Sequence, residues 1–283
     1  MSNPLCQIHV LDLGTVQLDS SFLVLGRNPG VKQQVPVYAY VIFTGDDLIL
    51  VDTGFRSCEI MKRVGMLGVQ QPENTLESQL DAIGLAPNDI TMIIQTHLHI
   101  DHAGRTDLFP MSIPVVLDRS ELAFSVCGIG GYQPEDIKHL IDRVHTPKAL
   151  RFLDLQLTGP ITLAPGVRCI PARGHTQGSL IVDVTTKGGQ IAICGDLLYD
   201  VEHQVIKPHQ TKILDEPRIT GNHSATKIDE SAAIKRLLNE FELILPSHDA
   251  AARISNGRVV ARPEFNDIEG VSYGARMTTK LPT

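Results

Sequence analysis

THLHIDH, residues 96–102, decides how the rest of the chain is interpreted, because it places three histidines and one aspartate within six positions. The stretch follows the apolar run ITMII (90–94), with Gln95 between them. Four proton-exchanging side chains at one point are costly to bury without partners, and a solvated loop rarely specifies so many of them. The pattern therefore indicates a binding site. Its members are His97, His99, Asp101 and His102.

Length and composition limit the classes of protein to which this chain can belong. With 283 residues, 42% of them hydrophobic, the chain fits one α/β domain over residues 1–283. The net charge of −7 and the absence of a basic run argue against a nucleic-acid partner. No apolar run approaches 18 residues, so no membrane span or signal peptide is expected. Five scattered cysteines predict no disulfide framework and favour a cytoplasmic location.

Strand-like and helix-like stretches alternate along the chain, which predicts an α/β fold. Apolar runs predict a hairpin from 37–45 and 47–54, with further strands at 90–97, 113–118, 166–175, 179–186, 190–196 and 242–249. Helices are expected at 74–84, 134–144 and 229–241, the first capped by Asn74 and stopped by Gly84. The second helix is expected to bury Ile137, Leu140, Ile141 and Val144, and the third Ile234, Leu237, Leu238 and Phe241. Residues 200–228 are expected to be irregular.

Polar residues follow the ends of several of these strands. They are Asp52, His97 to His102, His175, Asp196 and His248. Loops at strand ends converge on one rim in layered α/β folds, so these residues can meet. Imidazole nitrogens and carboxylate oxygens suit Zn, Fe or Mn, and six ligands suit two ions that share a bridge. The isolated His9, His139 and His145 are interpreted as ordinary residues.

Five motifs in order, VDTG, THLHIDH, GHT, GD and SHD, span residues 51–249 and resemble the metallo-β-lactamase fold superfamily of hydrolases. The resemblance implies a four-layer αββα sandwich with the site at one edge. It implies two zinc ions, with Mn, Fe and Co as alternatives. The implied ligands are His97, His99 and His175 for the first ion and Asp101, His102 and His248 for the second. Asp196 would bridge the ions with a hydroxide, and Asp52 would orient a ligand histidine.

Individual residues within these motifs favour some branches of the superfamily over others. Asp196, and not a cysteine, stands at the bridging position, which disfavours lactam hydrolysis. The His-x-His pattern disfavours the di-iron oxygen-reducing branch, and the acidic pI disfavours the RNA-processing branch. Tyr199, three residues after Asp196, resembles the tyrosine with which N-acyl-homoserine lactonases hydrogen-bond their substrate. The alternative for Tyr199 is core packing. Two departures from the lactonases, a short GHTQGSLIV and a long 200–228 segment, leave the substrate open.

The resulting hypothesis is a hydrolase that opens a lactone or cleaves a carboxylic ester. Asp101 would act as general acid and Tyr199 would stabilise the oxyanion. Phosphodiesterase, nuclease-like or thioesterase members of the fold remain alternatives, as does a non-catalytic metal sensor, whereas a serine hydrolase lacks its G-x-S-x-G signature. We expect a small-molecule substrate, no nucleic-acid or membrane partner, and a homodimer as one assembly. Segments 28–36 and 200–228 are expected to flank the pocket, and an acyl tunnel is expected from Ile137, Val205, Ile206, Ile213 and Leu214.

Overall fold

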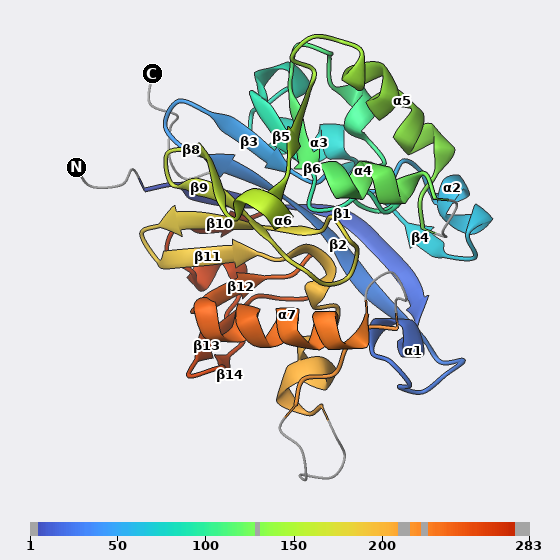
Figure 1. Cartoon of the computed structure of the whole chain (residues 1–283), viewed down its shortest axis with the longest axis vertical. Coiled ribbons are helices and arrows are strands. Elements are labelled where there is room, and N and C mark those ends of the chain that lie inside the picture. Colours follow the sequence, from blue (N-terminus) through green and yellow to red (C-terminus); the bar gives the residue numbers. More distant parts are fainter. Residues whose placement is uncertain (1–4, 128–130, 209–215, 222–225, 275–283) are drawn as a thin grey trace.

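Two β-sheets stack face to face in the computed structural model, which describes residues 5–127, 131–208, 216–221 and 226–274 (Figure 1). The first sheet has the strand order β15-β1-β2-β3-β5-β6-β7, and β4 pairs with β1. Its strands are β1 (Gln7–Asp19), β2 (Lys32–Phe43), β3 (Leu48–Val51), β4 (Leu67–Val69), β5 (Met92–Ile94), β6 (Val115–Asp118), β7 (Leu150–Leu153) and β15 (Val271–Tyr273).

The second sheet has the order β14-β13-β12-β11-β10-β9-β8. Its strands are β8 (Ile161–Ala164), β9 (Val167–Pro171), β10 (Leu180–Thr186), β11 (Gly189–Ile193), β12 (Leu243–Leu245), β13 (Ala252–Ser255) and β14 (Arg258–Ala261). The strands expected at 166–175, 179–186 and 190–196 are β9, β10 and β11, which pair with one another in antiparallel order. This part of the prediction is confirmed.

Helices cover the outer faces of both sheets. They are α1 (Ser20–Leu23), α2 (Cys58–Arg63), α3 (Leu76–Ala82), α4 (Arg119–Ser125), α5 (Pro134–Val144), α6 (Leu155–Thr158) and α7 (Lys227–Glu240). Short helical turns are η1 (Pro72–Asn74), η2 (Pro87–Asp89), η3 (Thr106–Leu108), η4 (Gly195–Leu197), η5 (Glu202–Ile206) and η6 (Phe265–Asp267). None of the described helices combines the length and the apolar character that a bilayer span requires.

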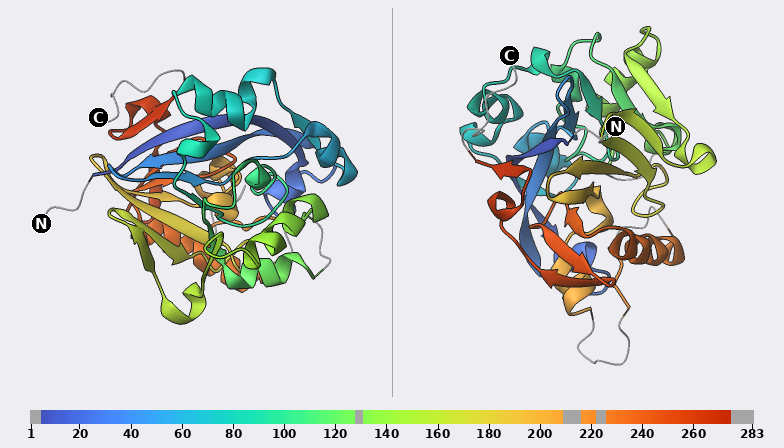
Figure 2. Two further views of the ribbon diagram at one scale, coloured as in Figure 1. Left: turned by 90° about the horizontal axis from the view of Figure 1, so that it is seen from above. Right: turned by 90° about the vertical axis from the view of Figure 1, so that its left-hand side faces the viewer.

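Three buried clusters hold the layers together. Between the sheets, side chains such as Ile42 of β2 pack with Val182 of β10. Leu140 of α5 belongs to the cluster under the first sheet, and Ile234 of α7 to the cluster under the second. Figure 2 shows the orange helix α7 on the opposite side of the two sheets from the cyan helices α2 and α3. The predicted αββα sandwich is therefore confirmed.

The first sheet contains a strand that sequence patterns missed. The predicted hairpin is present as β2 and β3, with Tyr40 opposite Val51. The missed strand is β1, whose apolar residues alternate with polar ones but change phase between Val10 and Leu11 and again between Leu13 and Val16. Its pairing with β2 shifts register between Asp12 and Thr15. Because β1 pairs with β2 as far as Asp19 opposite Lys32, β2 begins earlier than expected. Residues 32–36 of the segment that was expected to flank the pocket therefore belong to a regular strand, and the flanking role itself stays a prediction.

The helix α5 has the predicted bounds but a different buried face. Ile137 and Leu140 are buried, whereas Ile141 is 40% and Val144 is 41% exposed. Arg143 is fully buried in their place and donates hydrogen bonds to four backbone carbonyls. The periodicity misplaces the face because it assigns every apolar residue to the core and an arginine to solvent.

The other two helices differ from expectation mainly at their starts. Thr75, not Asn74, caps α3, because the Thr75 hydroxyl accepts the backbone N–H of Ser78 at 3.2 Å. Gly84 follows α3 with a left-handed φ of 78°, as a stop residue should. Thr226 caps α7, whose predicted buried residues Ile234, Leu237, Leu238 and Phe241 are all buried.

The segment 200–228 is not irregular throughout, because Glu202–Ile206 form one turn of π-helix, η5. Such turns occur frequently at functional sites. The predicted tunnel residues Ile213 and Leu214 lie outside the described residues.

Candidate metal centre

Strand order places the predicted ligands at one edge of the sandwich. Within the first sheet β3 and β5 run parallel, and within the second sheet β11 and β12 run parallel. The carboxyl ends of parallel neighbours lie at the same edge of a sheet, where sites form in open α/β folds. The ligands follow these ends or the end of β9, and all are buried: His97, His99, Asp101, His102, His175, Asp196 and His248.

Three histidines form the first ligand group. The Nε2 atom of His97 lies 3.1 Å from Nδ1 of His99, and Nε2 of His175 lies 3.1 Å and 3.0 Å from these two atoms. On the far side of its ring, Nδ1 of His97 lies 3.1 Å from the Thr96 hydroxyl oxygen. Three ring nitrogens from two different sheets therefore face one another across a distance that a single ion spans.

Asp101, His102 and His248 form the second ligand group. Nδ1 of His102 donates to Asp52 at 2.8 Å, and Nδ1 of His248 donates to the Pro36 carbonyl at 2.7 Å. Because the proton of each neutral ring is used on Nδ1, the Nε2 lone pairs point into the site. Nε2 of His248 lies 3.4 Å, and Nε2 of His102 3.8 Å, from the Asp101 carboxylate.

Asp196 faces both groups at once. Its Oδ2 atom lies 3.6 Å from Nε2 of His97 and 3.4 Å from Nε2 of His175. Its Oδ1 atom lies 3.1 Å from Nε2 of His102 and 3.2 Å from Nε2 of His248. One carboxylate thus presents one oxygen to each ligand group.

The buried donor set has the properties of a metal site. Among the described residues, neither oxygen of Asp196 nor Nε2 of His102 or His248 has a hydrogen-bond partner. Buried lone pairs that face one another are unfavourable unless a cation lies between them. Imidazole and carboxylate are the usual protein ligands of zinc, alongside cysteine thiolate. These residues therefore fit bound metal ions.

The two groups differ in protonation. Burial lowers the pKa of His97 well below its usual value, and lowers that of His99 to about 4 and that of His175 to about 3. Burial also lowers the pKa of His102, but the carboxylates of Asp196 and Asp52 outweigh burial and raise it well above the usual value. The first group thus offers neutral nitrogens, whereas the carboxylates around His102 favour a positive charge at that ring, which either a proton on Nε2 or a bound cation supplies.

Asp52 links the ends of β3 and β5. Its carboxylate accepts the backbone N–H and the hydroxyl of Thr96, each at 2.7 Å, as well as Nδ1–H of His102. Its backbone has a φ of 61°, in the left-handed region that residues other than glycine rarely adopt. This placement beside a ligand histidine agrees with the orienting role that the resemblance implied. Such backbone strain is typical of functional sites.

Tyr199 lies beside both groups. Its ring stacks on His248 with centroids 4.9 Å apart and meets the edge of His175 at 5.8 Å. Burial and the Asp196 carboxylate raise the pKa of the Tyr199 hydroxyl well above its usual value, so the hydroxyl keeps its proton. The side chain is therefore both packed in the core and adjacent to the candidate metal centre.

Other predicted and unpredicted residues complete the description. His9, His139 and His145 lie in neither ligand group. Glu121 is a fully buried acid behind the first group, and sequence reasoning missed it. Its only local signal is an acidic residue three positions after the end of β6, beside the apolar Leu122.

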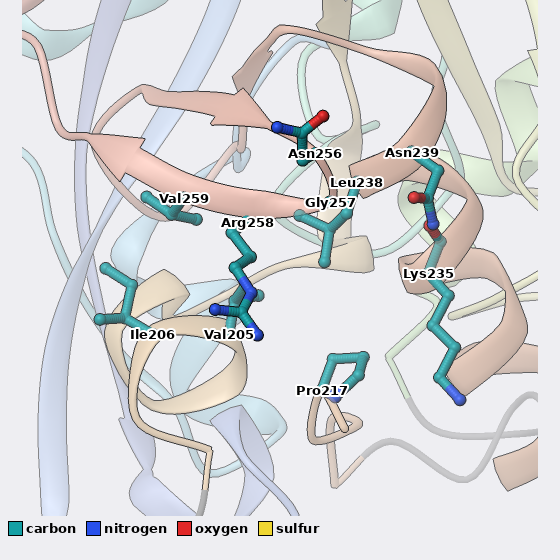
Figure 3. A pocket seen from close by; sticks show the side chains of 10 residues that line it. All are labelled: Val205, Ile206, Pro217, Lys235, Leu238, Asn239, Asn256, Gly257, Arg258 and Val259. Atoms are coloured by element: carbon teal, nitrogen blue, oxygen red, sulfur yellow. The ribbon is translucent and has the colours of Figure 1, made fainter. Parts of the chain in front are cut away.

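A separate cavity of about 370 Å³ lies between η5, α7 and the β13–β14 hairpin (Figure 3). Val205, Ile206 and Leu238 supply apolar lining, and Lys235 and Arg258 supply charged groups. None of the predicted ligands lines this cavity. Val205 and Ile206, which were expected to line an acyl tunnel, therefore line this cavity, which is separate from the predicted ligands. Ile137 belongs to the hydrophobic core under α5.

A family model, the metallo-beta-lactamase superfamily, matches residues 33–248. The chain belongs to this superfamily. A curated N-acyl homoserine lactonase of Bacillus cereus is 27% identical over 256 residues, which cover 86% of this chain and 93% of the relative. The predicted membership of this hydrolase superfamily is confirmed.

Solved structures show the same fold. A quorum-quenching N-acyl homoserine lactone hydrolase superposes with a TM-score of 0.68 at 22% identity, covering 88% of this chain and 94% of its own. A dizinc quorum-quenching lactonase bound to a product gives a TM-score of 0.66 at 17% identity, covering 93% of this chain and 96% of its own. At these identities the likeness shows that the fold is shared.

Proposed function

We propose that the protein is a dinuclear-metal-dependent hydrolase that opens a lactone or cleaves a carboxylic ester. The observation that carries the proposal is the position of Asp196, which presents one carboxylate oxygen to each of two buried ligand groups. We propose His97, His99 and His175 as ligands of the first ion, Asp101, His102 and His248 as ligands of the second, and Asp196 as the shared ligand. Zinc suits these donors.

Two bound ions would lower the pKa of the attacking water and polarise the carbonyl oxygen of the substrate. The remaining steps fall to side chains. The Tyr199 hydroxyl, which stays protonated beside Asp196, would donate a hydrogen bond to the oxygen that gains negative charge.

Asp101 would move the proton. As the water adds to the carbonyl carbon, its proton passes to the Asp101 carboxylate, which lies 3.4 Å from Nε2 of His248. When the carbon–oxygen bond of the ring breaks, Asp101 returns that proton to the leaving alkoxide. Water and lactone thus give a hydroxy acid, with no other reactant consumed.

Two observations favour a lactone over other substrates: the activities of the related proteins and the net charge of this chain. The Bacillus cereus relative and the two solved structures above are lactonases that act on, or bind products of, N-acyl homoserine lactones. The net charge of −7 provides no steering for polyanions such as RNA. We therefore propose a small lactone with a neutral or apolar body. The cytoplasmic location, the homodimer and the single domain over 1–283 stay predictions.

A substrate panel tests the proposal. Zinc-loaded and zinc-stripped protein are assayed with N-acyl homoserine lactones, a matched linear ester, a thioester, a phosphodiester and a β-lactam. The expected result is zinc-dependent hydrolysis with the highest kcat/KM on a lactone. Phosphodiester or thioester turnover above that of every lactone and ester would replace the proposal with one of those activities. Tight zinc binding without any turnover would indicate a metal sensor instead.

A further inference from the structure

Glu121 of α4 is a buried acid whose two carboxylate oxygens hold the chain from both sides. Oε1 accepts the backbone N–H of Leu98 at 3.0 Å and the hydroxyl of Tyr132 at 3.0 Å. Oε2 accepts the hydroxyl of Thr176 at 2.6 Å and the backbone N–H of Gly178 at 3.1 Å. An ionised carboxylate only accepts hydrogen bonds, so these four donors match its full capacity for strong contacts.

The partners of Glu121 flank the first ligand group. Leu98 stands between His97 and His99, and Thr176 directly follows His175. The loop with His97 and His99 comes from the end of β5 in the first sheet, whereas His175 comes from the loop between β9 and β10 in the second. One carboxylate therefore ties together the two loops that must meet for the first group to form.

A third partner acts on the ring of a ligand. The Tyr132 ring lies 4.8 Å from the ring of His99, at an interplanar angle of 50°. Because the Tyr132 hydroxyl donates to Glu121, the same carboxylate fixes the backbone before His99 and the ring beside it.

The backbone around Glu121 is closely packed against the turn that follows His175. A Cβ atom built on Gly178 would lie 2.2 Å from the backbone nitrogen of Glu121, so the turn after His175 lies directly against α4. The hydroxyls of Thr176 and Ser179 are 2.5 Å apart and brace this turn internally. A shift of the carboxylate would therefore be transmitted to the His175 loop.

We propose that Glu121 is a positioning residue that sets the spacing of the first ligand group by holding the His99 and His175 loops at a common carboxylate. The proposal rests on the proposed function, because it assumes that these histidines bind a metal ion. According to this proposal, Glu121 affects the affinity for the first ion but not for the second. The histidines of the second group are held instead by Asp52 and the Pro36 carbonyl.

The test compares Glu121→Gln with Asp183→Asn. In Glu121→Gln an amide NH₂ group, which donates hydrogen bonds, replaces one carboxylate oxygen that accepts them, so it would face two donors. The glutamine side chain has about the same size as the glutamate side chain. Asp183 is a matched control because it is also buried, with a partner in Arg168, but lies in the middle of β10 away from both ligand groups. Zinc affinities are measured by competition with a chromophoric chelator, and the absorption of the Co²⁺-substituted proteins reports the geometry of the ligands.

Glu121→Gln should weaken binding of the first ion by about 10-fold, the lower end of the effect of losing a direct partner of a ligand, because Glu121 holds the ligand loops and not a ligand ring. It should also change the Co²⁺ spectrum. Asp183→Asn should keep both affinities. Unchanged affinities and an unchanged spectrum in Glu121→Gln would overturn the proposal. If Glu121→Gln does not fold, Tyr132→Phe provides a second test, because it removes one of the four donors to Glu121. It should lower the affinity for the first ion by about fivefold, which corresponds to the net contribution of one hydrogen bond. No loss in Tyr132→Phe would then overturn the proposal.

The outcomes separate this inference from the proposed function. A wild-type protein that binds no metal ion overturns both. A wild-type protein that binds two ions and hydrolyses lactones, together with a Glu121→Gln variant of unchanged affinity and spectrum, overturns the positioning role alone.

Discussion

The two ligand groups lie on either side of Asp196, yet they are built differently. The first consists of three imidazoles, whose pKa values are lowered by burial, and its loops are held by Glu121. The second contains the Asp101 carboxylate and two histidines held through Nδ1, and the pKa values of both are raised by neighbouring carboxylates. The first group thus depends on Asp196 for negative charge, whereas the second has a carboxylate of its own.

The largest effect is expected from Asp196→Asn, because within the described part of the chain Asp196 is the carboxylate that joins the three histidines of the first group. Zinc affinity should fall by more than ~100-fold, beyond the range of an outer partner, and the first ion should be lost before the second. Elemental analysis after dialysis measures the zinc that remains. Two retained zinc ions per chain would show that Asp196 is not shared between the groups.

Single-ligand variants separate the groups. His97→Ala and His102→Ala should each lose about one zinc ion per chain while keeping the other, because each removes a nitrogen from one group only. His139→Ala serves as the control and should keep the zinc content of the unmodified protein, since His139 lies in neither group. Equal zinc content in all three variants would mean that the ligand assignment is wrong.

Asp52→Ala probes how the second group is supported. The variant removes the acceptor that holds the proton of His102 on Nδ1, and affinity for the second ion should fall by about 10- to 100-fold. Asp52 also accepts from Thr96, whose hydroxyl lies beside Nδ1 of His97, so Asp52→Ala should weaken binding of the first ion as well, but to a smaller degree. Glu121→Gln should leave the affinity for the second ion unchanged, and chelator competition distinguishes these two patterns. A larger loss of the first ion than of the second in Asp52→Ala would contradict the support of His102 by Asp52.

Tyr199→Phe should change catalysis without changing metal binding. The loss of one hydrogen bond to the transition state, about 1.4–2.7 kcal/mol, lowers kcat/KM by about 10- to 100-fold. Steady-state assays on the best lactone and elemental analysis of the same sample provide the measurement. A reduced zinc content, or an unchanged kcat/KM, would mean that Tyr199 only packs against His248 and His175.

The residues of the two buried groups can be identified from the sequence because each follows a strand in a short local motif; that they bind metal stays a prediction. His97 and Asp101 are marked by THLHIDH itself, and the parallel pairing of β3 with β5 and of β11 with β12 brings the distant motifs to one edge. The supports are harder to predict. Glu121 has partners 11 to 57 residues away, and no local pattern distinguishes it from a glutamate on an exposed helix face.

Similar reasons explain the errors in the fold. The alternation of apolar and polar residues along β1 changes phase twice, and its pairing with β2 shifts register between Asp12 and Thr15, so no single two-residue period runs through the strand. On α5, Arg143 is buried because backbone carbonyls surround it, a contact that depends on the loop before β6 rather than on helix periodicity. Local patterns find elements and their ends, whereas buried polar contacts follow from tertiary packing.

Anomalous diffraction at the zinc edge, from a crystal of the zinc-loaded protein, tests the central claim most directly. Two peaks are predicted about 3.5–4 Å apart, the separation typical of two-metal sites. One should lie among His97, His99 and His175, the other among Asp101, His102 and His248, with Asp196 between them. A single peak, or peaks away from these residues, would contradict the account.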